Sequence, residues 1–131
     1  MAKNAKFWYI RSSAVQNVHN QEVLEYVVKT DENSDVRFHA VANITNQELL
    51  KDILLNGDKQ IRDLAAHRIT DKNILNDIAR NYDDWFVRKD TVKRITDEDV
   101  LIDIAKNDAK DSVRYEAVIL FTVSFLTNQS S

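Results

Sequence analysis

Apolar residues recur along this chain at helical spacing, and the spacing itself repeats. An apolar residue followed by arginine occurs five times, at Ile10-Arg11, Val36-Arg37, Ile61-Arg62, Val87-Arg88 and Val113-Arg114. The successive arginines are therefore separated by 26, 25, 26 and 26 residues. A fixed period in the range of 20–50 residues is the sequence signature of a repeat architecture.

Counted from the residue before each arginine, the apolar positions fall at i, i+4, i+5 and i+8, as on one face of an amphipathic helix. This pattern predicts five helices, which we call VR helices, over residues 10–18, 36–44, 61–69, 87–95 and 113–121. A second apolar stripe predicts four intervening helices, which we call LL helices, over residues 23–28, 49–54, 74–79 and 100–105.

A recurring phrase links the two kinds of helix. It reads ITNQELL at 44–50, ITDKNIL at 69–75 and ITDEDVL at 95–101. Its threonines are predicted helix N-caps, with Glu48 and Asp99 as capping-box partners; they are Thr45, Thr70 and Thr96. In the polar turns after the LL helices, Asn56, Asn81 and Asn107 are expected to adopt the left-handed conformation.

Helices of about ten residues are too short to be stable alone in water, so each pair must bury its apolar stripe against neighbouring pairs. The sequence therefore predicts an all-α protein, an α-α superhelix built from about five repeats of 25–26 residues with partial terminal repeats. Residues 1–131 are expected to form a single α-solenoid domain.

The combined pattern L-x-x-I-A-x-N-D, V-R-x-x-A-V and I-T-x-x-x-L resembles the short HEAT-like repeats, and most closely the leucine-rich repeat variant. The resemblance covers residues 10–121 and is carried best by IARNYDDWFVRKDTVKRIT and IAKNDAKDSVRYEAV. It implies a binding scaffold whose VR helices line the concave face. In the variant, one helix of each repeat is often partly 3₁₀, and the sequence does not decide this for the present chain. The chain departs from the variant in having no proline. Because it also has no cysteine, the cluster-binding and bilin-modifying roles of some relatives do not carry over.

Composition narrows the chemistry. The formal net charge is -3 and the pI about 5.6, which argues against a dedicated nucleic-acid coat protein. The absence of cysteine excludes disulfides, thiolate metal sites and cysteine nucleophiles. With one glycine and no paired histidines, the sequence predicts no enzyme, cofactor or metal site.

Two apolar runs bear on location. Phe7 to Ile10 is too short for a secretory signal, so a cytoplasmic protein is expected. Ala117 to Val123 is too short to span a membrane and is interpreted as a docking helix.

The arginine column is interpreted as a structural ladder made of Arg11, Arg37, Arg62, Arg88 and Arg114. The expected partners are aspartates that shortly precede an arginine, namely Asp35, Asp58, Asp84 and Asp111. An anion-binding column is the alternative.

The exposed side of the VR helices is the predicted binding face, with a protein or peptide partner. The candidate residues combine basic and aromatic side chains: Phe38, His39, His67, Arg68, Lys89, Lys93, Arg94 and Tyr115. The same residues would also suit nucleic acid or phosphate, and a merely solvated face is the non-functional alternative.

Both ends of the predicted stack are apolar: Phe7, Trp8 and Tyr9 at one end, and Phe121, Phe125 and Leu126 at the other. We expect each terminal segment to fold back over its own end, giving a monomer. An end-to-end dimer is the alternative.

Overall fold

The structure, a computed structural model, describes residues 7–129, which form nine α-helices and no strand. The protein is therefore all-α, as predicted. The helices fall into two compact units, Met1–Thr70 and Asp71–Ser131, each of which is described separately below. Phe7 is the only described residue in 3₁₀ conformation, so no described helix is partly 3₁₀ as helices of the variant often are.

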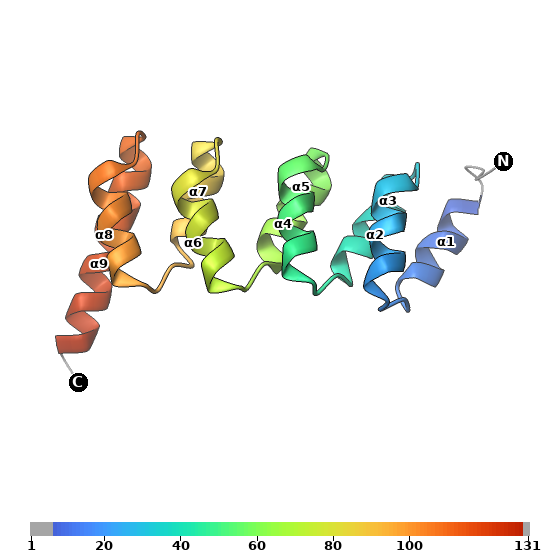
Figure 1. The fold of residues 1–131 in the computed structure, drawn as a ribbon, viewed down its shortest axis with the longest axis horizontal. Helices are drawn as coiled ribbons and strands as arrows, with labels where there is room; N and C mark the ends of the chain where they lie inside the picture. Colours follow the sequence, from blue (N-terminus) through green and yellow to red (C-terminus); the bar gives the residue numbers. More distant parts are fainter. Residues whose placement is uncertain (1–6, 130–131) are drawn as a thin grey trace. The chain divides into compact units, whose positions relative to one another are not determined.

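The first unit contains five helices (Figure 1): α1 (Trp8–Val15), α2 (Gln21–Thr30), α3 (Ser34–Ala42), α4 (Gln47–Asn56) and α5 (Lys59–Arg68). The LL helices α2 and α4 each pack on the VR helix that follows them, and the VR helix α3 packs against both α1 and α5. Leu24, Val36, Ile44 and Leu50 are fully buried between these helices. Short amphipathic helices are thus stabilised by packing on one another.

The second unit contains four helices (Figure 1): α6 (Lys72–Asn81), α7 (Trp85–Val92), α8 (Glu98–Asn107) and α9 (Asp111–Gln129). The LL helices α6 and α8 pack on α7 and α9, and α7 packs on α9. Val92, Leu101, Val113 and Ala117 form its buried centre. As in the first unit, each LL helix packs on the VR helix that follows it, and successive VR helices pack on each other.

The N-caps of the LL helices differ from the prediction by one residue. The capping side chains are those of Asn20, Asn46, Asp71 and Asp97, and each accepts a hydrogen bond from the backbone N–H three residues on. Thr45, Thr70 and Thr96 immediately precede three of these caps. Asparagine and aspartate are at least as good as threonine in this role, so the cap falls on the second polar residue of the phrase.

The C-terminal turns also differ from the prediction. No described residue has a positive φ, so Asn56, Asn81 and Asn107 are not left-handed. Each is instead the last residue of its helix and donates a side-chain hydrogen bond of 2.8 Å to the aspartate four residues earlier, which is Asp52, Asp77 or Asp103. The next residue then leaves the helix in an extended conformation.

Side chains at fixed repeat positions join neighbouring repeats in the first unit. The Gln21 carbonyl oxygen accepts from the backbone N–H groups of Thr45 and Asn46, both at 3.0 Å. Gln47, one repeat later, accepts from Thr70 at 2.7 Å. These bonds satisfy backbone donors in the turns that precede the LL helices.

Helix α9 is about twice as long as the other VR helices because its sequence lacks a cap. The position nine residues after each ladder arginine holds Asn20, Asn46, Asp71 or Asp97, but after Arg114 it holds Val123. Valine has no oxygen to accept from the following N–H groups, so nothing favours a new helix start there. The chain continues as one helix to Gln129.

The terminal segments do not cover the ends as predicted. Tyr9 and Ile10 of α1 are at least half exposed, and so are Phe125 and Leu126 of α9. Because residues 121–129 continue α9 as one helix, they form no separate segment that folds back over the end of their unit. Among the described helices, none has the combination of length and apolar character needed to cross a bilayer.

Candidate binding surface

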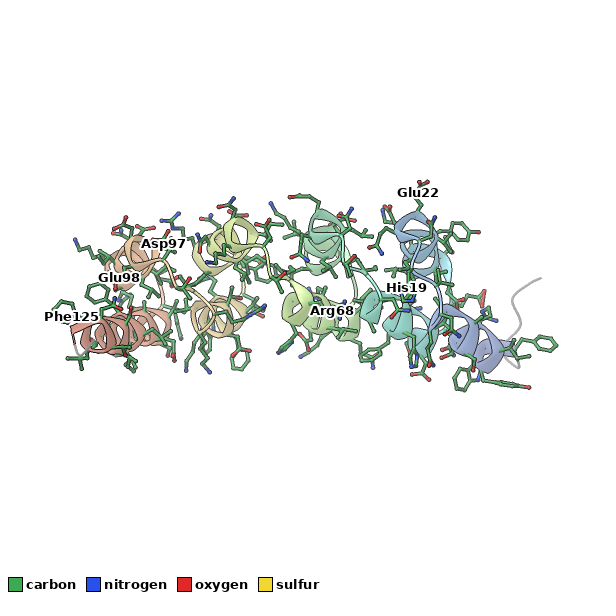
Figure 2. All side chains as sticks on the ribbon, turned by 90° about the horizontal axis from the view of Figure 1, so that it is seen from below. His19, Glu22, Arg68, Asp97, Glu98 and Phe125 are labelled. Carbon is green, nitrogen blue, oxygen red and sulfur yellow. The ribbon has the colours of Figure 1, made fainter. Side chains whose placement is uncertain are left out.

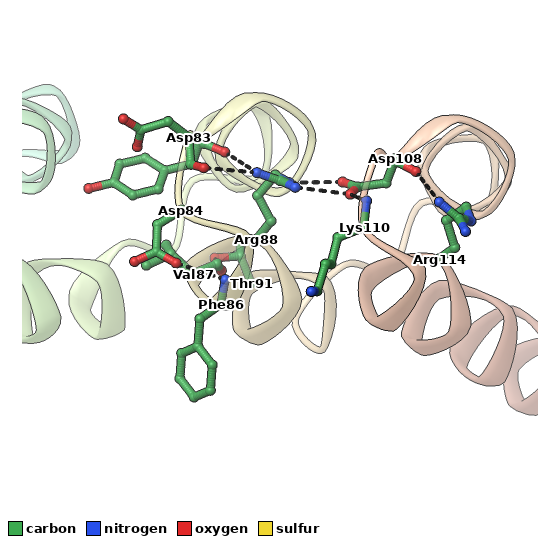
Figure 3. A network of polar contacts seen from close by, with 10 residues as sticks. Asp83, Asp84, Phe86, Val87, Arg88, Thr91, Asp108, Lys110 and Arg114 are labelled. Atoms are coloured by element: carbon green, nitrogen blue, oxygen red, sulfur yellow. Dashed lines mark hydrogen bonds and ion pairs between the residues drawn. The ribbon is translucent and has the colours of Figure 1, made fainter.

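Arg88 lies at the centre of a polar network in the second unit (Figure 3). Its Nε and Nη2 donate to the two carboxylate oxygens of Asp108 at 2.9 and 3.0 Å. Its Nη1 donates to the backbone carbonyl of Tyr82 at 2.7 Å. Arg88 on the VR helix α7 thereby binds the C-cap residue of α6 and the C-cap residue of α8 together.

Two arginines of the first unit make the corresponding contacts. Arg11 forms a bidentate pair with Asp31, the C-cap residue of α2, at 2.8 and 3.1 Å. Arg37 donates to the Asp31 carbonyl at 2.8 Å and to the carboxylate of Asp58 at 3.1 Å. In the second unit, Arg114 donates to the Asp108 carbonyl at 2.7 Å. Arg62 is half-buried at the same position of α5.

The carboxylates in these contacts are mostly not the predicted ones. Asp31 and Asp108 sit at helix C-termini, where the carboxylate of each binds the arginine of the preceding VR helix. The backbone carbonyl of each accepts from the arginine of the following VR helix. Of the predicted partners only Asp58 binds a ladder arginine, because Gly57 occupies the C-cap position before it. Asp84 caps α7 instead, and Asp111 accepts from the N–H of Ser112.

The pKa of the Asp108 carboxyl is shifted by its surroundings. Burial of this group would raise its pKa, but hydrogen bonds from Arg88 and from the Lys110 N–H outweigh that effect. The positive charges of Arg88 and Arg114 act in the same direction. The pKa of Asp108 therefore lies below its ordinary value of 3.8, and the carboxyl is ionised at neutral pH.

Four of the predicted binding residues belong to the first unit, on the packed helices α3 and α5. Phe38 is 43% exposed and its ring meets that of His39 edge-on. The Nδ1 atom of His39 is within hydrogen-bond distance of the Ser12 hydroxyl and of the Asp35 carbonyl. Arg68 Nε donates to the Ile44 carbonyl at 3.1 Å. His39 and Arg68 thus contribute to packing between repeats, whereas Phe38 remains open to a partner.

His67 completes this set. It is exposed, and its Nδ1 lies 2.7 Å from the carbonyl of Asp63, one turn earlier on α5. The contact orients the imidazole along its own helix and leaves the rest of the ring accessible.

The other four predicted residues belong to the second unit, on the packed helices α7 and α9. Lys93 is exposed and 3.7 Å from the Asp90 carboxylate, a surface pair. Lys89 and Arg94 are half-buried, and Tyr115 on α9 is 67% exposed. The structure describes each set of four within its own unit.

Two exposed aromatic residues at the start of α7 were missed by the sequence reasoning. Trp85 and Phe86 pack edge-to-face at 5.7 Å, and the Lys110 ammonium lies 4.7 Å from the Trp85 ring centre. Figure 3 shows Phe86 directed away from the Arg88 network. A signal was available: Phe86 and Tyr9 occupy the same repeat position, two residues before the ladder arginine.

A cavity of about 360 Å³ lies beside the ladder in the first unit. Lys29, Asp31, Arg37, Asp52 and Asp58 line it, and their charges are matched in ion pairs with one another or with adjacent residues. Because these charges are already paired, the described lining of the cavity has no unpaired positive or negative group that would bind an ion. Over residues 7–129, no group of three or more His, Asp or Glu side chains could hold a metal.

No protein-family model matches this chain, and no curated protein or solved structure matches it either.

Proposed function

We propose that the chain is a non-catalytic helical-repeat scaffold that binds a protein or peptide partner through the outward face of its VR helices. The observation that carries this proposal is the exposure of aromatic side chains on two of these helices: Phe38 on α3 and Phe86 on α7. Aromatic residues that are open in the free protein and flanked by long basic side chains are typical of interaction surfaces.

The proposal includes the arrangement of the repeats. We infer that the helix pairs stack in succession as a short α-solenoid, a HEAT-like scaffold. The inference is supported by equivalent contacts in both units: Arg37 and Arg88 each join the C-terminus of one LL helix to the turn of the next. Solenoids of this kind commonly present one continuous face to a ligand.

Helix α7 defines the chemistry of the partner most clearly. Phe86, Lys89 and Lys93 are spaced at i, i+3 and i+7, so they project from one side of the helix. Two ammonium groups beside an exposed phenyl ring fit a peptide that carries carboxylates next to an apolar or aromatic residue.

Phosphate or nucleic-acid binding is the alternative. It is less supported because the arginines best suited to phosphate are engaged elsewhere. Arg88 is occupied by Asp108, and the Nε of Arg68 donates to a backbone carbonyl. The lysines that remain give weaker, less directional phosphate contacts.

The experiment is selection from a random peptide library displayed on phage, with a fluorescent single-stranded oligonucleotide as the competing probe. We expect enrichment of acidic peptides with aromatic or aliphatic residues, and loss of their binding in Phe86→Ala/Lys93→Glu. The matched control reverses the charge of two exposed lysines on the LL helices α6 and α8, in Lys72→Glu/Lys106→Glu. This variant should bind the peptides like wild type.

Two outcomes would contradict the proposal. One is peptide binding that survives Phe86→Ala/Lys93→Glu but is lost in the Lys72/Lys106 control, which would assign the function to the LL helices. The other is oligonucleotide binding whose logarithm falls steeply and linearly with the logarithm of salt concentration, which would favour the phosphate alternative.

A further inference from the structure

Helix α9 carries an apolar surface on the side that faces away from its own unit. Its members form two rows in which residues are spaced three or four apart: Tyr115, Ile119, Val123 and Leu126 in one row, and Val118, Thr122 and Phe125 in the other. We call this set the α9 stripe. At 100° per residue it occupies less than half of the helix circumference. The buried residues Val113 and Ala117 lie on the opposite side.

The same repeat position is buried in three other VR helices, half-buried at Ala66 of α5 and exposed in α9. The fourth residue after the ladder arginine is Val15 in α1, Val41 in α3 and Val92 in α7, and these side chains are 4%, 0% and 0% exposed. Its equivalent in α9, Val118, is 46% exposed. The α9 stripe therefore continues a surface that is packed against other helices elsewhere in the protein.

Polar contacts hold the stripe in position. Glu98, labelled in Figure 2, lies at the start of α8. It accepts hydrogen bonds from the Ser124 hydroxyl at 3.0 Å and from the Asn128 amide at 3.3 Å. Glu98 occupies the position from which Gln21 and Gln47 bind the next turn of the chain. Here it ties the second half of α9 to α8, through residues on the side of α9 opposite the stripe.

We propose that the α9 stripe is a self-association surface, on which α9 of a second copy packs against α9 of the first about a two-fold axis. The charge pattern favours a second copy, because residues 117–129 contain no charged side chain and two such stripes can meet without repulsion. Spacings of three and four residues suit the packing of one helix along another. Two-fold pairing also closes the contact, whereas a different face on the partner would generate a filament.

The apolar area of the α9 stripe sets the affinity that we expect between two copies. Six side chains that are each roughly half exposed offer on the order of 500 Å² of apolar surface per copy. That is less than the roughly 800 Å² which a standard interface buries on each partner. The dimer should therefore be reversible and dependent on protein concentration.

Sedimentation velocity over a range of concentrations of the full chain tests the proposal. We expect a monomer–dimer equilibrium whose dissociation constant rises roughly tenfold or more in Val118→Asp/Phe125→Asp. Both positions are exposed, so helicity by circular dichroism should be unchanged. The matched control is Tyr9→Asp/Ile10→Asp, which charges equally exposed apolar residues on α1 and should leave the dimer intact.

The geometry is tested separately by cross-linking, since the chain contains no native cysteine. Thr122→Cys, near the middle of the stripe, should give a covalent dimer with a short bismaleimide, and Thr30→Cys on α2 should not. Three results would overturn the proposal. The first is a protein that stays monomeric at every concentration, including a monomer that co-sediments with phosphatidylcholine vesicles. The others are a dimer that dissociates in Tyr9→Asp/Ile10→Asp, and a cross-linked dimer from Thr30→Cys but not from Thr122→Cys. Each leaves peptide binding through Phe86 and Lys93 untouched, so the two proposals can fail independently.

Discussion

At the scale of single residues, the arginines of the ladder differ mainly in how well their partners are shielded from water. The Asp108 carboxylate bound by Arg88 is 3% exposed, whereas the Asp58 carboxylate bound by Arg37 is 48% exposed. A charge pair in water contributes little, but removing one partner of a buried pair leaves the other uncompensated.

This difference predicts unequal effects of the same substitution. We expect Arg88→Ala to lower the free energy of unfolding by about 3 kcal/mol and Arg37→Ala by about 1 kcal/mol, as measured by urea denaturation. Lys93→Ala, which removes an exposed pair, should fall within about 0.5 kcal/mol of wild type. Equal losses for the two arginine variants would show that partner burial does not set the strength of the ladder.

Asp108 also predicts how stability depends on pH. Its pKa is lower in the folded protein than in the unfolded chain, so the folded state favours the ionised form. The ionised Asp108 carboxylate contributes its full stabilisation at a pH above the pKa that Asp108 has in the unfolded chain. That stabilisation is lost as the pH falls through the lower pKa of the folded protein. Asp108→Asn should therefore be less stable than wild type at pH 7, and the difference should shrink as the pH is lowered from about 4 to about 2.

The control for the pH experiment is Asp90→Asn, whose carboxylate is about half exposed and pairs loosely with Lys93. Its stability should follow that of wild type closely across the same range, because exposed pairs contribute little. A constant difference between wild type and Asp108→Asn down to pH 2 would refute the assignment.

At the scale of helices, the caps can be tested by neighbouring substitutions. Asp97 accepts hydrogen bonds from the N–H groups of Asp99 and Val100, whereas the adjacent Thr96 is exposed and lies outside α8. Asp97→Ala should destabilise the protein by about 1 kcal/mol, and Thr96→Ala by much less. Thermal unfolding monitored by circular dichroism measures both, and a larger loss for Thr96→Ala would restore the threonine as the cap.

Gly57 predicts a packing effect at the junction of α4 and α5. Its φ is -81°, so its backbone conformation is open to any residue, but a Cβ atom there would lie 2.7 Å from the Ile53 carbonyl oxygen and 2.9 Å from the Ile61 side chain. Gly57→Ala should therefore destabilise the protein by about 1–3 kcal/mol. Asn56→Ala, at the exposed neighbouring position, should cost less in the same denaturation experiment.

The sequence predicted the helices well because their apolar positions repeat at a constant offset from each arginine. It misplaced the caps because threonine and the following asparagine or aspartate are both good acceptors, and only backbone geometry selects between them. It missed the length of α9 because the decisive feature is the absence of an oxygen at Val123, within a segment that otherwise resembles the other repeats.

The candidate surface was harder to predict, since the same side chain can serve packing or recognition. Arg68 and Lys93 look alike in the sequence, but Arg68 reaches the Ile44 carbonyl while Lys93 remains exposed. Which carbonyl groups lack a backbone partner, and which side chains can reach them, depends on how successive repeats pack. The exposure of the Phe86 ring likewise depends on how the helices around α7 pack, which the sequence alone does not give.

At the scale of the whole molecule, stability should vary along the chain because interior helices have more neighbours than a terminal one. Helix α3 packs on α1, α2 and α5, and buries Val36, Ala40 and Val41. Helix α1 packs on α3 alone among the principal contacts and buries only Ser12 and Val15. A short helix is stabilised chiefly by the helices on which it packs, so local opening is easiest where such contacts are fewest.

Native-state hydrogen exchange should therefore show α1 opening before α3. We expect the amides of residues 12–15 to exchange with a lower protection than those of residues 38–42, at concentrations where the protein is monomeric. Asn43→Ala should widen the gap, because the Asn43 amide donates to the carbonyl groups of Val15, Gln16 and Val18 and anchors the end of α1. The contrary result is equal protection of the α1 and α3 amides that stays equal in Asn43→Ala. In that case the first unit opens as one cooperative block, and α1 is as stable as α3.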